Sequence, residues 1–184
     1  MHAGRLMWPP PFKGFFEWIG TLPGSQYLRE DAPSFFGTFL TVHVLSMCLF
    51  LGLVLMMDLR LLGVAHLGTP VSQIQKRLFP WQLFGAIVMS VSGLVLFYAQ
   101  PVLYWGKGFY WVKMLVMLPL AMANLLVFHF TTYRSVAEWD DAPDPPVAAR
   151  LAGFLSIVLW IAVLCFGRLV AYDWWTIVEG VPGA

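Results

Sequence analysis

A long uncharged segment near the N-terminus constrains the fold more than any other feature. Residues 32–57 contain no charged side chain, and about 20 apolar residues are enough for a helix to cross the hydrocarbon core of a bilayer. We therefore predict a transmembrane helix over residues 35–64. His43 lies inside this helix, and an ionisable side chain at membrane depth is by default a candidate functional residue.

Three more apolar segments follow, and the composition agrees with a membrane protein. The chain of 184 residues is 59% hydrophobic and only 11% charged, whereas soluble domains carry roughly a quarter charged residues. Short connections make consecutive spans alternate in direction. The sequence therefore predicts an all-α integral membrane four-helix bundle with up-down-up-down topology, with spans at residues 35–64, 76–103, 109–133 and 148–172.

The segments outside the bundle are predicted to form an arm with a short helix and a tail. Residues 1–34 are expected to form an arm and a short amphipathic helix, residues 35–175 the bundle, and residues 176–184 a tail. The short helix either lies in the membrane interface or packs on the bundle as a lid. Its apolar positions at helical spacing are Phe15, Trp18, Ile19 and Leu22. Thr69 is expected to cap the second span, and Pro119 to kink the third.

The charge pattern sets partners and orientation. The net charge is +1, so nucleic acid is not an expected partner and the lipid bilayer is. Both chain termini fall at one end of the bundle, here called side A, and the opposite end is side B. Side B has more basic residues near its helix ends: Arg60, Lys76, Arg77, Arg134 and Arg150. The positive-inside rule therefore predicts that side B faces the cytoplasm.

Helical rise predicts which residues share a depth with His43. Near side A, other spans bring thioethers, cations and an aromatic hydroxyl to about the same level: Met114, Met117, Lys113, Arg168 and Tyr98. Haem b requires side chains of this kind: an axial imidazole, a thioether as a second axial ligand, and cations that neutralise its propionates. In this interpretation His43 is the iron ligand. Met117 or Met114 is the sixth ligand, unless the iron is five-coordinate. Lys113 and Arg168 bind the propionates. Alternatively, His43 forms a hydrogen bond across helices or binds another metal.

A second polar group is expected near side B, where the first and third spans carry Asp58, Arg60, Asn124 and His129. His129 and His43 differ in depth by about 18 Å at helical rise, so they cannot ligate one haem. His129 is expected to bond Asp58 as a structural latch, or to serve a second cofactor or a proton path. Asp58 and Arg60 at the interface can also simply fix the helix position.

Several of these residues together resemble a known pattern. The series is His43, Gly52, Asp58-Leu59-Arg60-Leu61-Leu62-Gly63, Lys76-Arg77-Leu78, Lys113, Asn124, His129 and Gly167-Arg168. It resembles a family of uncharacterised bacterial four-span membrane proteins over most of the chain. The layout is also similar to HemJ-type haem proteins, which bind haem b and oxidise protoporphyrinogen, and more loosely to CopD-like membrane domains. Asp58 stands where HemJ-type proteins tend to have proline.

The resemblance implies that His43 is an axial haem ligand and that the protein lies in a bacterial inner membrane. The positive-inside rule then predicts that both termini, at side A, are periplasmic. The expected function is intramembrane electron transfer through haem b, linked to a quinol or to other membrane redox subunits. One alternative is a non-redox accessory subunit of a respiratory or photosynthetic complex, docked through small residues of the second span (Ala86, Ser90, Gly93). Others are HemJ-like protoporphyrinogen oxidation and copper handling. Whether the protein is an enzyme stays open.

Overall fold

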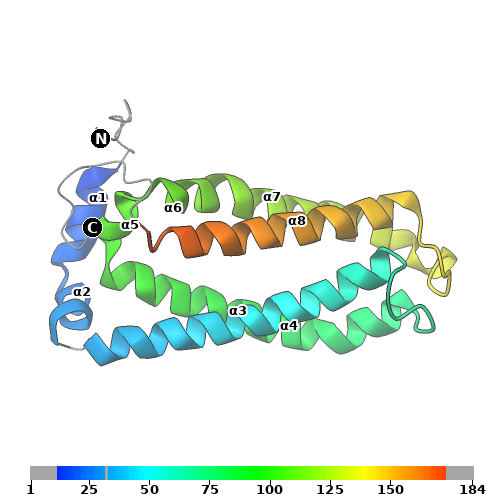
Figure 1. Ribbon diagram of the computed structural model, residues 1–184, viewed down its shortest axis with the longest axis horizontal. Helices are drawn as coiled ribbons and strands as arrows, with labels where there is room; N and C mark the ends of the chain where they lie inside the picture. The colour runs from blue at the N-terminus through cyan, green and yellow to red at the C-terminus, as the bar shows by residue number, and fades with distance from the viewer. Residues whose placement is uncertain (1–11, 32, 173–184) are drawn as a thin grey trace.

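The computed structural model describes residues 12–31 and 33–172, and this part of the chain is helical without strands. Four helical segments are long and apolar enough to cross a membrane: Ser34–Leu61, Val71–Ala99, Gly108–Glu138 and Val147–Leu169. Consecutive segments run in opposite directions (Figure 1). The predicted all-α four-helix bundle is therefore confirmed, and membrane insertion follows from the length and composition of its helices.

The helices begin and end close to the expected positions. The first span is α3 (Pro33–Leu61), the second is α4 (Val71–Ala99) and the fourth is α8 (Val147–Leu169). α3 ends before residue 64 because Gly63 adopts a left-handed conformation, φ 72°. α4 starts before residue 76, so its basic pair Lys76-Arg77 lies within the helix.

The third span is interrupted next to its proline. It consists of α6 (Gly108–Val112), a π-helical turn η2 (Lys113–Met117) and α7 (Leu118–Phe130), followed by the 3₁₀ helix η3 (Thr132–Glu138). Pro119 has no N–H to donate to the carbonyl one turn earlier, and its ring clashes with that carbonyl. The widened turn that precedes Pro119 accommodates this clash.

α3 is the helix that joins the two halves of the bundle. It packs along α4, and it also contacts α8, which in turn packs on α7 (Figure 1). α3 and α8 approach each other closely at Gly153. A Cβ atom there would lie 3.0 Å from the Asp58 carbonyl oxygen and 3.1 Å from Leu61 Cβ. The two helix pairs therefore meet closely near side B only because Gly153 lacks a side chain.

The N-terminal helix α1 (Lys13–Thr21) covers side A as a lid (Figure 1). Phe16 and Ile19 are its buried side chains, and the Phe16 ring packs edge-on against Phe97 at 5.5 Å. Phe15 and Trp18, two of the predicted apolar positions, are exposed. α1 continues through α2 (Pro23–Gln26) and the π-helical η1 (Tyr27–Asp31) into α3, while α5 (Pro101–Trp105) lies beneath it.

At side B, buried hydrogen bonds join the helices to the backbone of the loops. Arg60 is fully buried, and its guanidinium donates to the carbonyl oxygens of Thr69 at 2.9 Å, Ala142 at 3.1 Å and Asp140 at 3.3 Å. The Asp140 carboxylate accepts from the Ser72 N–H at 2.7 Å and from its hydroxyl at 2.6 Å. The expectation that Thr69 caps α4 is therefore wrong. A carboxylate from the loop before α8 binds the first turn instead, as the helix dipole favours.

Alanine at Gly153 is expected to lower the free energy of unfolding by about 1–3 kcal/mol, because the new methyl group would press on the α3 backbone. The matched control is Gly52→Ala on α3, where a Cβ meets nothing within 4 Å. That change should stabilise the helix by about 0.5–1 kcal/mol. Thermal unfolding in detergent, followed by circular dichroism, measures both. Equal and favourable shifts for the two variants would contradict the tight crossing.

Replacement of Arg60 by lysine is expected to destabilise the protein by about 3 kcal/mol, because a single ammonium group cannot reach carbonyls that a guanidinium fork spans. Arg77→Lys, at an exposed position of α4, is the control and should change stability by less than about 0.5 kcal/mol. Chemical unfolding of the two purified variants tests this. If the Arg60→Lys protein were as stable as the wild type, a positive charge alone would stabilise side B, and the several donors of the guanidinium would not be required.

Candidate functional site

His43 of α3 lies against α4 with a defined hydrogen-bond arrangement. Its Nδ1 is 2.9 Å from the Met89 carbonyl oxygen and 3.1 Å from the hydroxyl of Ser92. The Ser92 hydroxyl itself donates to the Val88 carbonyl at 2.6 Å. Both groups therefore accept from Nδ1, so Nδ1 carries the proton of the neutral ring. The lone pair is left on Nε2, which is the arrangement of a metal-ligating histidine held by a second partner.

A glycine makes room for the His43 ring. A Cβ atom at Gly93 would lie 3.0 Å from His43 Cε1 and 3.4 Å from Nδ1. The other small residues of this α4 stripe, Ala86 and Ser90, line a cavity between the helices. Ala86 is half-buried and Ser90 is exposed. Docking of another subunit on this stripe, as in the accessory-subunit alternative, stays a prediction.

Lys113 is the predicted cation that the structure places near His43. It begins the π-helical turn η2, and its Nζ would lie 3.3 Å from a Cβ atom at Gly167 of α8. Its charge is within electrostatic range of the His43 ring. Of the two candidate thioethers, Met117 is half-buried and packs against the core cluster of Phe50 and Trp160, whereas Met114 is exposed.

Two further predicted residues contact other groups. The Arg168 side chain is exposed, donates to the Tyr172 hydroxyl at 3.2 Å and lies over the Tyr172 ring at 5.3 Å. The Tyr98 hydroxyl would lie 2.8 Å from a Cβ atom at Gly24, so this side chain packs against α2. Arg168 and Tyr98 thus contact different parts of side A.

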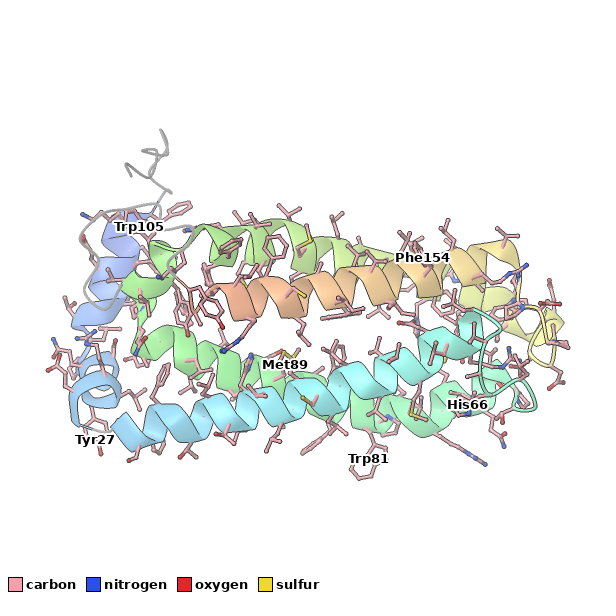
Figure 2. The ribbon with its side chains drawn as sticks, viewed as in Figure 1. Tyr27, His66, Trp81, Met89, Trp105 and Phe154 are labelled. Atoms are coloured by element: carbon pink, nitrogen blue, oxygen red, sulfur yellow. The ribbon has the colours of Figure 1, made fainter. Side chains whose placement is uncertain are left out.

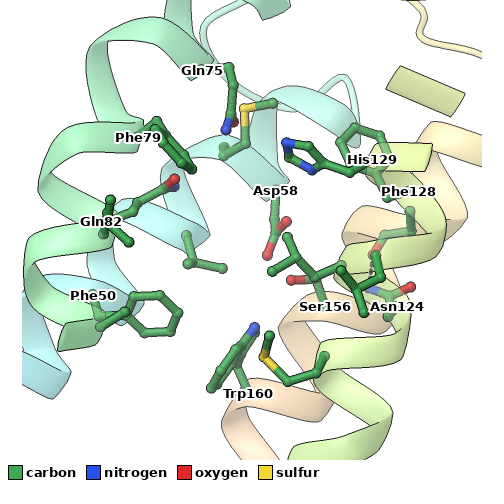
Figure 3. A pocket seen from close by; sticks show the side chains of 18 of the residues that line it. Phe50, Asp58, Gln75, Phe79, Gln82, Asn124, Phe128, His129, Ser156 and Trp160 are labelled. Atoms are coloured by element: carbon green, nitrogen blue, oxygen red, sulfur yellow. Dashed lines mark hydrogen bonds between the residues drawn. The ribbon is translucent and has the colours of Figure 1, made fainter. Parts of the chain in front are cut away.

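Three residues of the second predicted group line one cavity of about 570 Å³ between the two helix pairs (Figure 3). Asp58 comes from α3, and Asn124 and His129 come from α7. The Asn124 amide donates to the Ala152 carbonyl at 3.0 Å. Sequence analysis missed the other polar lining residues, which are Gln75, Gln82, Ser90 and Ser156. Gln75 and Gln82 are seven residues apart on α4, and this spacing would have placed both on one helix face.

Arg60, the fourth member of that group, does not line the cavity. Its guanidinium binds loop carbonyls at side B, so the expected cluster of four is wrong in this respect. The predicted latch between Asp58 and His129 is also absent. Asp58 Oδ2 and His129 Nδ1 are both buried without a hydrogen-bond partner among the described residues.

Protein ligands alone do not form a metal centre in the part of the chain that the structure describes. No three side chains of histidine, cysteine, aspartate or glutamate lie close enough together to hold an ion there. Figure 2 shows that the outer faces of the long helices carry mainly carbon-rich side chains, as expected of surfaces in contact with lipid. The chemically distinctive groups are thus His43 near side A and the cavity around Asp58.

Comparison with known proteins identifies a family without assigning an activity. No curated protein matches the chain, and no solved structure matches it. A relationship to HemJ-type or CopD-like proteins is not shown. Residues 15–173 match the model of a family of unknown function, DUF6644, and this match spans the lid helix and all four long helices. The chain belongs to the DUF6644 family.

Proposed function

We propose that this protein binds haem b in the membrane through His43 and transfers electrons within the bilayer. The observation that carries the proposal is the hydrogen bond from His43 Nδ1 to the Met89 carbonyl. It fixes the tautomer in which Nε2 is free to bind iron, and it makes the imidazole a stronger electron donor.

Haem suits a site with one well-placed imidazole. The porphyrin brings its own equatorial ligands, so the protein needs to supply only one or two axial side chains. A centre built from protein side chains alone requires three or more, and the described residues offer no such group. When bound, haem supplies a one-electron redox couple whose potential depends on the axial ligand, burial and nearby charge.

The surrounding residues have distinct roles in this proposal. Gly93 lets the His43 ring lie on α4, and Ser92 gives Nδ1 a second acceptor. Lys113 is the nearby cation suited to a propionate. Met117 is the better candidate for a sixth ligand, because it is half-buried within the bundle while Met114 is exposed. Arg168 would have to leave Tyr172 before it bound a propionate.

We place the protein in a bacterial inner membrane with side B in the cytoplasm, following the basic residues near the side B helix ends. The described ends of the chain, α1 and the end of α8, lie together at side A (Figure 1), which would then be periplasmic. An electron donor or acceptor dissolved in the bilayer, such as a quinol, suits a redox group held between membrane helices.

Protein purified from haem-replete cells is expected to show a Soret band that His43→Ala weakens by about tenfold or more, because the iron ligand is gone. His129→Ala is the matched control, since His129 is also an intramembrane imidazole but lines a cavity that His43 does not. Its spectrum should equal that of the wild type. Imidazole added to a His43→Gly protein should restore the band, which separates ligand loss from misfolding. Colourless wild-type protein, or equal losses in both alanine variants, would overturn the proposal.

Gly93→Ala is expected to retain the iron ligand but to weaken haem binding about tenfold, because the methyl group displaces the ring from the Met89 carbonyl. The bound haem should also show a higher midpoint potential, since the imidazole donates less charge. Gly52→Ala serves as the control, because that position has open space. Spectroscopic redox titration measures both proteins. An unchanged affinity and potential in Gly93→Ala would mean that the hydrogen bond does not shape the ligand.

A further inference from the structure

The cavity between the two helix pairs has the dimensions of a ligand site. Its volume is about 570 Å³, within the range of about 300–1,000 Å³ that small-molecule pockets occupy. Its walls are mainly apolar side chains from α3, α4, α7 and α8. His43 does not line the cavity, although Met89, whose carbonyl accepts from its ring, does.

Asp58 is the charged group of this cavity. Its carboxyl group points into the middle of the space, beside the Ser156 hydroxyl (Figure 3). The side chain is only 5% exposed, and its Oδ2 has no hydrogen-bond partner among the described residues. No lysine or arginine is among the described residues that line the cavity, and the guanidinium of Arg60 is held by loop carbonyls. A buried carboxylate without a cation is costly in a membrane, and a bound positive charge would offset that cost.

Aromatic rings surround the carboxyl group and suit a cation as well. The cavity is lined by Phe50, Phe79, Phe128, Phe130 and Trp160. Phe50 and Trp160 form an edge-to-face pair with centroids 4.8 Å apart. Aromatic faces attract organic cations, and this attraction grows when the site is shielded from water. The combination of a single acid and several rings therefore selects a cation with apolar substituents over a small hydrated ion.

The cavity can be entered from the side of the bundle. Several lining residues are also exposed on the outer surface of the protein, including Phe79 of α4 and Leu126 of α7, at 48% and 49%. In a membrane, this surface contacts hydrocarbon. A ligand that arrives this way must dissolve in the bilayer and still carry the charge that Asp58 binds.

We propose that the Asp58 cavity binds a lipophilic organic cation, such as a quaternary ammonium, a phosphonium or a protonated amine with aryl or alkyl groups. The Asp58 carboxylate is its counter-ion, and the surrounding rings contact its apolar groups. The site does not depend on haem binding at His43, so either proposal can fail without the other.

Tetraphenylphosphonium tests this proposal, with the anion tetraphenylborate as a probe of similar shape and opposite charge. The full chain is reconstituted in nanodiscs, and binding is measured by equilibrium dialysis against protein-free nanodiscs. We expect saturable binding of one phosphonium per chain and no saturable borate binding. Equal binding of both ions, or no phosphonium binding beyond the lipid background, would overturn the proposal.

Asp58→Asn keeps the shape of the side chain and should weaken phosphonium binding by about tenfold or more, because the counter-ion is lost. Glu17→Gln, which neutralises an exposed acid on α1, should bind like the wild type. Phe79→Leu provides a second test at a position that is 48% exposed. It should weaken binding several-fold, while Phe79→Tyr should not. Wild-type affinity in both Asp58→Asn and Phe79→Leu would overturn the proposal.

Discussion

Polar side chains on α3 must find their partners inside the protein, because hydrocarbon offers no hydrogen bonds. Three of them meet this constraint in different ways. His43 donates to the Met89 carbonyl of α4, and Arg60 donates to loop carbonyls at side B. Asp58 is buried, but one of its oxygens has no hydrogen-bond partner in the part of the chain that the structure describes. The candidate functional groups are the atoms that these arrangements leave free, namely the Nε2 lone pair of His43 near side A and a carboxyl oxygen of Asp58 in the cavity.

The arrangement of the helices follows from where α3 can be approached closely. Gly93 allows the His43 ring to lie on α4, and Gly153 allows α8 to reach the α3 backbone beside Asp58. The α3–α4 pair and the α7–α8 pair therefore meet near side B, where loop contacts to Arg60 close the end. Between them, aromatic and polar side chains line the cavity instead of filling it. Gly93 and Gly153 thus set where the helices approach closely, and the cavity lies between the helix pairs.

The sequence predicted the number, type and direction of the long helices, because length and apolar composition decide these properties. It also predicted that Asp58, Asn124 and His129 lie near one another. It could not predict the acceptor of His43, since a backbone carbonyl such as that of Met89 has no sequence signature. Helical rise predicts the level of Tyr98 and Arg168 along the bundle axis, but it does not predict the direction in which each side chain points. Arg60 was misplaced because its partners lie in loops, and Asp140 is 80 residues away.

Family membership in DUF6644 adds no chemistry, so the proposed activity depends on the geometry around His43. The most direct measurement is the haem content of the wild-type protein purified from haem-replete cells, determined as the pyridine haemochrome and divided by the protein concentration. Our account predicts haem b at about one equivalent per chain, because one imidazole is poised as a ligand. Protein that is folded by circular dichroism but neither contains haem nor takes up added haem would contradict it.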